Sequence, residues 1–397
     1  MAAFDRRAAL GFGAAGILSA LRPVRAETVT LPFANGERPL VKYPEKRDLL
    51  VLTSRPPQLE TPFAVYNEGL LTPNDAFFVR YHLADLPLTI DPDTFRLSVK
   101  GHVERPISLS LAELKAMGAT EIVAVNQCSG NGRGFFEPRV AGGQAANGLM
   151  GNARWTGVPL RTVLEKAGIR AGAVQVRFDG MDGPVADGTP DFAKSLALDH
   201  ARDGEVMLAW GMNGQDLPFL NGYPLRLVVP GYFGTYWVKH LNEITVLETP
   251  LANFWMATAY RIPDNDCNCV VPGTAPAKTK PIGTFKVRSF ITSVLPGASV
   301  KAGPQTLSGF AFDGGSGIKG VEVSADGGAT WIAGTLGQDL GKYSFRGWTA
   351  PVSLAAGEHA LKVRATSNAG ETQPVEQPWN PAGYLRNLVE TTTVRAA

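Results

Sequence analysis

The sequence is poor in cysteine, and this scarcity excludes several classes of protein. Three cysteines occur among 397 residues, so the chain is not a small scaffold held together by disulfides. It contains neither the CxxCH motif that attaches haem nor the CxxC and HExxH motifs that are typical of zinc sites. The five histidines show no metal-ligand spacing among themselves. The familiar sequence signatures for haem and zinc are therefore absent.

Charge is also scarce and nearly balanced. Charged residues make up 19% of the chain, the net charge is +2, and no run of lysine or arginine occurs. Because a nucleic-acid-binding surface needs concentrated positive charge, we predict no nucleic-acid partner. Long apolar runs are lacking as well, since the run from Ala8 to Leu21 is too short to be a convincing membrane span. We therefore predict no membrane span.

The short apolar run is better interpreted as part of an export signal. Arg6 and Arg7 precede it, and Val24-Arg25-Ala26 follows it and resembles a small-residue cleavage site. Paired arginines indicate the Tat pathway, which exports folded proteins that usually carry a cofactor. A Sec signal that happens to contain two arginines is the alternative. We predict a twin-arginine signal peptide over residues 1–26 and a mature protein in the periplasm.

Glycine and proline are abundant, and their distribution suggests two domains. The 44 glycines and 29 prolines favour short strands, turns and loops over long helices. Residues 27–270 contain many short elements of both kinds and are predicted to form an α+β domain. Composition changes over residues 271–283, which we interpret as a linker. Residues 284–397 alternate strand-like runs with turns and predict an all-β, immunoglobulin-like sandwich.

Local patterns place several elements in the first domain. Residues 27–75 are rich in proline and polar residues, and we predict an extended arm that wraps the domain. The capping box SLAE at residues 110–113 predicts a short helix. Pro159 and Gly168 mark the first turn and the C-cap of a second helix. Residues 191–201 are predicted to form a third.

The segment with the most chemical content is IVAVNQCSGNGRGFFEPR, which runs from residue 122 to residue 139. A strand-like apolar run delivers Cys128 into a glycine-rich turn, where the backbone can closely approach a ligand. Arg133 follows five residues later. A thiolate beside a guanidinium suits a soft metal that holds an anionic substrate. A buried structural cysteine in a surface turn explains the same pattern, and the segment alone leaves both interpretations open.

Two other segments carry basic residues that could bind an anion. Arg80 and His82 alternate on a short strand and therefore share a face, which indicates either an anion clamp or an ordinary charged surface strand. Arg226 and Lys239 flank the turn Pro230-Gly231. Backbone NH groups in such a turn, next to two cations, could cradle a phosphate. An exposed turn followed by core aromatics is the alternative.

The end of the first domain supplies Tyr260 and a Cys-x-Cys pair, Cys267 and Cys269. Two thiols at this spacing could be a redox pair or a metal site. A surface loop without a catalytic role is the simpler interpretation, and the sequence assigns the pair no function.

Six segments taken together resemble the sulfite oxidase family of molybdenum enzymes: VNQCSGNGRG, FFVRYH, NARWTGVPL, GYPLRLVVPG, WVKHL and WNPAGYLRN. Each is weak alone, but they follow one another in the family's order and cover nearly the whole mature chain. The resemblance implies a sulfite-oxidase-type molybdopterin-binding domain followed by an immunoglobulin-like dimerisation domain. It also implies a molybdopterin-type molybdenum cofactor and a homodimer formed through the C-terminal domain, while the missing haem motif predicts no haem in this chain.

The resemblance also assigns roles to individual residues. It implies that Cys128 ligates the molybdenum and that the other cofactor-binding positions are His82, Arg226 and Lys239. It implies that the catalytic positions are Arg80, Arg133 and Tyr260. The chain departs from the animal enzymes in having Asn221 in place of a histidine and Tyr236 in place of an arginine. These departures resemble the bacterial periplasmic sulfite dehydrogenases.

The function that the resemblance implies is oxidation of sulfite to sulfate at the molybdenum centre. Because the chain has no haem motif and no spare length for one, we expect a separate c-type cytochrome to accept the electrons one at a time. A sulfane dehydrogenase, which keeps the C-terminal sandwich, is the main alternative, and a periplasmic methionine-sulfoxide reductase, which normally lacks it, is another. An alternative of a different class is a secreted binding protein without a cofactor that uses the sandwich for adhesion.

Overall fold

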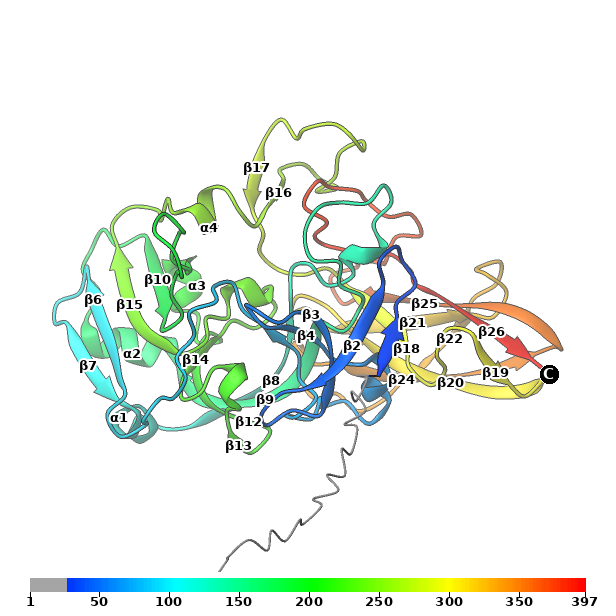
Figure 1. Cartoon of the computed structure of the whole chain (residues 1–397), viewed down its shortest axis with the longest axis horizontal. Coiled ribbons are helices and arrows are strands. Elements are labelled where there is room, and N and C mark those ends of the chain that lie inside the picture. Colours follow the sequence, from blue (N-terminus) through cyan, green and yellow to red (C-terminus); the bar gives the residue numbers. More distant parts are fainter. Residues whose placement is uncertain (1–26) are drawn as a thin grey trace, which may run out of the picture.

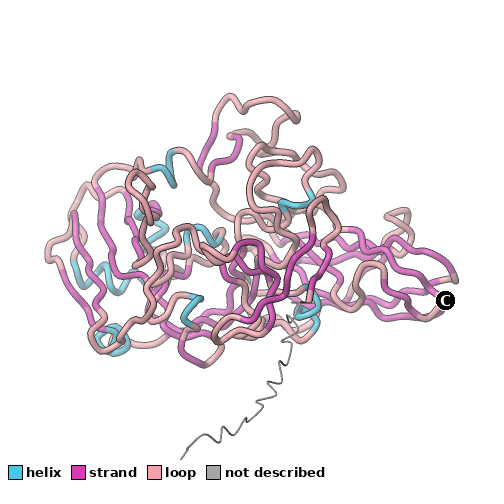
Figure 2. Tube along the Cα trace, viewed as in Figure 1, coloured by secondary structure: helices cyan, strands magenta, loops and turns pink. Residues whose placement is uncertain are grey.

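The computed structural model describes residues 27–397, and the export signal predicted for residues 1–26 lies outside the described residues. An α+β body and a β-sandwich lie side by side along the long axis of the molecule, and the chain ends at the far tip of the sandwich (Figure 1). Strands and loops make up most of the trace, and the helices are short (Figure 2). The fold class predicted from the sequence, an α+β domain followed by a β-sandwich, is confirmed.

The N-terminal segment forms a sheet, so the prediction of an extended arm is wrong. Its five strands pair in sequence order: β1 (Thr28–Thr30), β2 (Glu37–Lys42), β3 (Asp48–Thr53), β4 (Gln58–Glu60) and β5 (Val79–Arg80). Leu49, Leu59, Val79 and Tyr81 are buried together and give this sheet a small core of its own. The 3-10 helix η1 (Phe63–Asn67) lies between β4 and β5. The prolines misled the prediction because most of them lie between the strands, although Pro39 is part of β2.

The second sheet has the order β11-β10-β15-β6-β7. Its strands are β6 (Arg96–Gly101), β7 (Ile107–Ser110), β10 (Gln175–Gly180), β11 (Ala193–Ala197) and β15 (Leu241–Leu247). The helix predicted over residues 191–201 is therefore wrong over most of its length, and only α3 (Leu198–Ala201) is helical. Antiparallel pairing with β10 holds residues 193–197 extended, a contact that local sequence does not reveal.

The third sheet delivers the strand that ends at the cysteine turn. It has the order β13-β12-β9-β8, and β14 also pairs with β12. Its strands are β8 (Thr120–Gln127), β9 (Met150–Pro159), β12 (Met207–Met212), β13 (Gln215–Asp216) and β14 (Arg226–Val228). The ring of Trp155 on β9 is fully buried and packs against Phe77 and Trp237. These three aromatic side chains form part of the core of the α+β domain.

The first two helices begin and end where the sequence signals place them. In α1 (Leu111–Ala116), the Ser110 side chain accepts from the Glu113 NH and the Glu113 carboxylate accepts from the Ser110 NH, which completes the capping box. Helix α2 (Leu160–Ala167) begins after Pro159 and ends at Gly168, whose φ is 71°. The remaining helical segments are α4 (Phe254–Ala257), η2 (Arg133–Phe135), η3 (Phe219–Asn221) and η4 (Gly234–Tyr236).

The hairpin of β16 (Arg261–Pro263) and β17 (Thr279–Pro281) leads into the sandwich. One sheet of the sandwich has the order β18-β20-β24-β23: β18 (Arg288–Ile291), β20 (Gly303–Phe312), β24 (Arg346–Leu354) and β23 (Thr335–Leu336). The other has the order β19-β26-β25-β21-β22: β19 (Ala298–Val300), β26 (Thr391–Ala396), β25 (Gly357–Ser367), β21 (Ile318–Ser324) and β22 (Ile332–Ala333).

The two domains share a packed boundary. Phe290, Phe310 and Phe345 of the sandwich belong to the same buried cluster as the core of the α+β domain, and Tyr66 contacts Phe310 edge-on. Arg288 is 1% exposed and bonds to Gln127 of the first domain. The sandwich is therefore fixed against the end of β8, the strand that leads to Cys128. None of the helices in residues 27–397 is long and apolar enough to cross a bilayer.

Candidate active site

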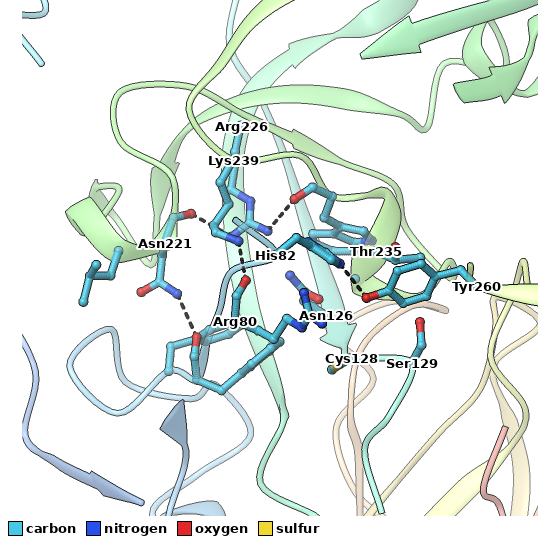
Figure 3. A pocket seen from close by; sticks show the side chains of 15 residues that line it. Arg80, His82, Asn126, Cys128, Ser129, Asn221, Arg226, Thr235, Lys239 and Tyr260 are labelled. Carbon is cyan, nitrogen blue, oxygen red and sulfur yellow. Dashed lines mark hydrogen bonds between the residues drawn. The ribbon is translucent and has the colours of Figure 1, made fainter. Parts of the chain in front are cut away.

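One pocket brings together side chains from five separate stretches of the chain. They come from the segment around β5, the end of β8, the η3–β14 region, the η4 region and the start of the β16 hairpin. Figure 3 shows Cys128 and Ser129 at one end, Arg226, Lys239 and Asn221 at the other, and Tyr260 at the side. Six of the seven residues predicted as site residues line this pocket: Arg80, His82, Cys128, Arg226, Lys239 and Tyr260.

Cys128 lies where β8 ends and a tight turn begins. Its NH donates to the Leu149 carbonyl over 2.9 Å, and its own carbonyl accepts from the Asn131 NH over 3.0 Å. The thiol is half-buried and is the one cysteine of the chain that is not in a disulfide. Gly132 follows at φ 85°, a left-handed conformation that favours glycine. The turn therefore fixes the backbone and leaves the sulfur facing the pocket.

The opposite end of the pocket holds two cations. The Arg226 side chain is 2% exposed, donates to the Asn221 carbonyl over 2.8 Å, and stacks on Trp155 with its Cζ 4.8 Å from the ring centroid. The Lys239 ammonium donates to the Arg80 carbonyl over 2.6 Å. Burial lowers the pKa of Arg226 to about 9. Burial and the nearby Arg226 charge likewise lower the pKa of Lys239.

These cations lack a matching anion. The pocket lining includes Arg80, Arg226 and Lys239 but no aspartate or glutamate. Asp182 is close enough to raise the pKa of Lys239, but it does not outweigh the effect of burial. A buried cation without a counter-ion is costly unless a ligand supplies the negative charge. The arrangement therefore fits an anionic group bound in the pocket.

Four buried polar atoms in the pocket wall have no hydrogen-bond partner among residues 27–397. They are Asn126 Oδ1, Ser129 Oγ, Thr235 Oγ1 and Arg226 Nε. Most buried polar groups in folded proteins are paired, so four unpaired ones around one cavity indicate groups kept free for a ligand. They extend from the cysteine end of the pocket to the cationic end. A long polar ligand that occupies both ends would satisfy all of them.

His82 and Tyr260 form a hydrogen-bonded pair in the side wall. The distance between His82 Nε2 and Tyr260 Oη is 2.6 Å, and the His82 ring stacks on Phe192 with a centroid separation of 3.6 Å. Burial, followed by the charges of Arg80 and Lys239, holds the pKa of His82 well below its usual value, so the imidazole is neutral at pH 7. Burial also raises the pKa of Tyr260, which keeps its hydroxyl protonated.

Arg133 is the one predicted site residue that does not line the pocket. Its Nε donates to the Ala382 carbonyl over 3.1 Å, and its Cζ lies 5.0 Å from the centre of the Tyr384 ring. It remains close enough to lower the pKa of Tyr260. The guanidinium is therefore held beside the pocket, near Tyr260, by the C-terminal part of the chain.

Cys267 and Cys269 are bonded to each other in a disulfide. The bond leaves neither thiolate free to ligate a metal ion, so that interpretation of the pair is not supported. The Cys267 side of the bridge is exposed, and the Asn265 amide donates to the Cys269 carbonyl over 2.8 Å.

Several pocket residues were not predicted from the sequence. Asn126, Ser129 and Thr235 are neighbours of predicted elements, but no motif marks an asparagine, serine or threonine as a ligand contact. Lys46 lies behind the cationic end, where its ammonium bonds to the Asn221 side chain and to the carbonyls of Asn74 and Phe77. Its signal is tertiary, because Lys46 is 175 residues from Asn221 in the chain.

Comparisons with known proteins identify both domains. Residues 83–255 match the family model "Oxidoreductase molybdopterin binding domain", and residues 279–395 match "Mo-co oxidoreductase dimerisation domain". The chain is 33% identical to mitochondrial sulfite oxidase of Homo sapiens over 91% of this chain and 68% of that protein. It is 29% identical to sulfite oxidase of Arabidopsis thaliana over 89% of this chain and 96% of that protein.

The structure also resembles a solved one. The crystal structure of the sulfane dehydrogenase SoxCD from Paracoccus pantotrophus covers 98% of this chain with a TM-score of 0.75 and a sequence identity of 24%, and 93% of that chain is covered. At this identity the likeness shows that the fold is shared across both domains.

The pocket fits the cofactor of this family. Cys128 would supply the thiolate that ligates molybdenum, and thiolates suit soft metals. Arg226 and Lys239 would hold the anionic part of the molybdopterin, while the unpaired Asn126, Ser129 and Thr235 atoms would meet its polar edges. The unpaired polar atoms, the cations without a counter-ion and the half-buried thiol that lines the pocket all suit one ligand. With the sequence identity above, they place this chain in the sulfite oxidase family of molybdenum enzymes, as an oxidoreductase that uses a molybdopterin-type molybdenum cofactor.

Proposed function

We propose that this protein is a periplasmic sulfite dehydrogenase, a sulfite:cytochrome c oxidoreductase that oxidises sulfite to sulfate. The observation that carries the proposal is the pocket's surplus of positive charge: three cations line it and no carboxylate does. Such a pocket attracts a small dianion in addition to an anionic cofactor. The names of the sulfite oxidase relatives support sulfite as that dianion.

The chain's own residues would bind and orient the substrate. Bound in the pocket, the cofactor supplies the two-electron oxidation at sulfur. Overall, sulfite and water give sulfate, two electrons and two protons. Arg80 is anchored by a 3.0 Å bond from its Nη1 to the Tyr81 carbonyl, and its charge faces the pocket near Cys128. Together with the nearby Arg133, Arg80 would neutralise the oxyanion, a contribution of about 3 kcal/mol for one well-placed donor.

His82 and Tyr260 would share a hydrogen bond whose direction can reverse, so that the pair can donate a proton to the substrate or accept one. When Nε2 of His82 carries the hydrogen, it donates to Tyr260 Oη, and the Tyr260 hydroxyl is then free to donate to an oxygen of the substrate. When Nε2 is bare, it accepts the Tyr260 hydrogen instead. Because the imidazole is neutral at pH 7, the pair can switch between these states without placing a further positive charge in the pocket.

The electron acceptor, the location and the assembly are parts of the same proposal. The twin-arginine pattern at Arg6 and Arg7 supports export to the periplasm, where we propose that a c-type cytochrome takes the electrons one at a time. The match of residues 279–395 to a dimerisation domain supports a homodimer formed through the sandwich.

The test is sulfite-dependent reduction of cytochrome c by molybdenum-loaded wild type and by Arg80→Met. We expect wild type to turn over and the variant to show a KM for sulfite raised by about tenfold or more, since one charged hydrogen bond is worth about 1.5–3 kcal/mol. Arg105→Met, which removes an exposed arginine, is the matched control and should leave KM unchanged.

Three outcomes would contradict this assignment. Loaded wild type that is not reduced by sulfite but is reduced by a protein-bound sulfane would move the assignment to a sulfane dehydrogenase. Loaded protein that instead reduces methionine sulfoxide would show the opposite direction of chemistry. Reoxidation by oxygen alone, without cytochrome c activity, would remove the cytochrome from the proposal.

A further inference from the structure

A segment from the C-terminal part of the chain returns to the candidate active site. Residues 379–386, which we call the C-terminal strap, lie between β25 and β26 of the sandwich, and they run beside the loop that follows Cys128 (Figure 1). The Trp379 indole donates to the Pro138 carbonyl over 2.8 Å, and the Val270 NH donates to the Trp379 carbonyl over 2.8 Å. The strap is therefore anchored both to the loop that follows Cys128 and to the loop of the β16–β17 hairpin.

Within the strap, Tyr384 contacts two residues assigned to the substrate site. Its ring stacks nearly parallel to the Tyr260 ring, with centroids 5.7 Å apart and an angle of 8°. The Arg133 guanidinium lies over the same ring, with Cζ 5.0 Å from its centroid. Two residues before Tyr384, the Ala382 carbonyl accepts a hydrogen bond from Arg133 Nε over 3.1 Å. A planar ring and a carbonyl from one strap thus fix both the plane and the direction of the guanidinium.

The backbone of the strap is shaped to bring Tyr384 into this position. The Asn380 side chain is 1% exposed, accepts from the Tyr384 NH over 3.1 Å and donates to the Tyr384 carbonyl over 2.8 Å. Gly383 has φ 61°, and a Cβ there would lie 2.9 Å from Arg133 Cγ and 2.4 Å from Val140 Cγ2. Only glycine lets the strap backbone come so close to these side chains, so the strap packs directly against Arg133.

The electrostatic surroundings place Tyr384 beside the reacting centre. Burial raises the pKa of Tyr384, the Arg133 charge lowers it, and a charge on Cys128 raises it again. For Tyr260, burial raises the pKa, Arg80 and Arg133 lower it, and Tyr384 and Cys128 raise it. The two stacked rings therefore lie within electrostatic range of both arginines and of Cys128.

We infer that Tyr384 is a positioning residue of the anion site: it holds Arg133 and Tyr260 in the arrangement that receives a tetrahedral oxyanion, so that a residue of the C-terminal domain supports the pocket of the first without lining it. This rests on the proposed function in assigning Arg133 and Tyr260 to the substrate. A guanidinium already fixed by a ring and a carbonyl loses less conformational freedom when it binds an anion, which tightens binding. Because Tyr384 acts through its neighbours, its removal affects anion affinity more than the rate of the bound complex.

The experiment uses the molybdenum-loaded protein and two substitutions at the same position. Tyr384→Phe keeps the ring and Tyr384→Leu removes it. We measure the affinity of sulfate, a tetrahedral dianion and the product, by calorimetry, and the kcat and KM for sulfite by cytochrome c reduction. The leucine variant should bind sulfate at least fivefold more weakly and raise KM to a similar degree with kcat changed less than twofold, whereas the phenylalanine variant should remain within twofold of wild type. Molybdenum content should be equal in all three.

Trp331→Leu is the matched control, because Arg364 lies over that ring in the sandwich with Cζ 4.3 Å from its centroid. It removes an arginine–aromatic contact away from the pocket and should leave sulfate affinity unchanged. If Tyr384→Leu does not fold, Gly383→Ala tests the same contact, since its methyl group must displace either the strap or Arg133 and should weaken sulfate binding.

The outcomes separate this inference from the proposed function. If a folded leucine or alanine variant binds sulfate as wild type does, the inference is overturned. If the leucine variant loses kcat and molybdenum instead, Tyr384 is a structural residue and the inference is again overturned. If wild type does not oxidise sulfite but sulfate binding still weakens with leucine and not with phenylalanine, the proposed function fails and the role of Tyr384 in the anion site stands.

Discussion

Replacing Arg226 by methionine should leave the cofactor-free protein at least as stable as wild type while abolishing cofactor retention. Arg226 is fully buried without a carboxylate partner, and burial lowers its pKa from 12.5 to about 9. One pKa unit corresponds to about 1.4 kcal/mol, so holding this charge in the folded apoprotein costs about 5 kcal/mol. Arginine stays charged at pH 7, and the cost therefore appears as lost stability.

Favourable contacts of Arg226 offset part of that cost. Its Nη1 and Nη2 donate to the Asn221 and Trp237 carbonyls over 2.8 and 3.4 Å, which together contribute about 2 kcal/mol. Its Cζ lies 4.8 Å from the Trp155 ring and 5.6 Å from the Trp237 ring, a further contribution of about 1–2 kcal/mol. The net change for Arg226→Met in the apoprotein is therefore about 1–2 kcal/mol of added stability.

The assay is urea unfolding of protein produced without molybdenum cofactor, with and without inorganic phosphate. Phosphate should stabilise wild type by occupying the cationic end of the pocket, and this stabilisation should disappear in Arg226→Met. Arg288→Met is the matched control: Arg288 is equally buried but pairs with Glu390 at 3.2 Å and donates to the Gln127 and Asn147 side chains, so its loss leaves buried acceptors unpaired and should destabilise the protein by about 1–3 kcal/mol. The reasoning is refuted if Arg226→Met costs as much as Arg288→Met, or if phosphate stabilises it like wild type.

Three further substitutions test other parts of the structure. Lys194 is fully buried with Nζ 2.7 Å from the Trp255 carbonyl, and burial lowers its pKa to about 7. The unfolded chain then binds more protons between about pH 7 and 10, so the stability of wild type relative to Lys194→Met should rise with pH across that window in urea unfolding; a flat difference would refute this. Gly309→Ala places a Cβ 1.9 Å from the Phe290 carbonyl and should lower stability by about 1–3 kcal/mol in thermal unfolding, and an unchanged midpoint would contradict the packing. Tyr260→Phe removes one hydroxyl of the proton-managing pair and should lower kcat by about 10²-fold with equal molybdenum content, whereas an unchanged kcat would exclude that role.

Features that depend on neighbouring residues in the chain could be predicted from the sequence. The capping box at Ser110 and Glu113 sets the start of α1 because both of its hydrogen bonds are local. Gly168 ends α2 for an equally local reason, since glycine readily adopts φ 71°. The position of Cys128 at the end of a strand followed from an apolar run that meets a glycine-rich turn.

Features that depend on distant partners could not be predicted in the same way. Residues 193–197 are extended because β10 pairs with them, which overrides their helical appearance. The motifs that resemble the family indicated the cations at Arg226 and Lys239. Nothing in the sequence shows that the Thr235 hydroxyl beside them lacks a hydrogen-bond partner. Tyr384 lies 251 positions after Arg133, and only the folded chain brings the two side chains together.

The central claim is that Cys128 binds a molybdenum centre that sulfite reduces. The most direct measurement is the electron paramagnetic resonance spectrum of loaded wild type and Cys128→Ser after addition of sulfite and a substoichiometric amount of oxidised cytochrome c as one-electron acceptor, with molybdenum determined on both. We expect wild type to contain about one molybdenum per chain and to develop a Mo(V) signal when the sulfite-reduced centre passes one electron to the acceptor, and we expect the serine variant to show neither that signal nor turnover. A loaded wild type that stays oxidised in sulfite, or a Cys128→Ser protein that responds like wild type, would contradict the account.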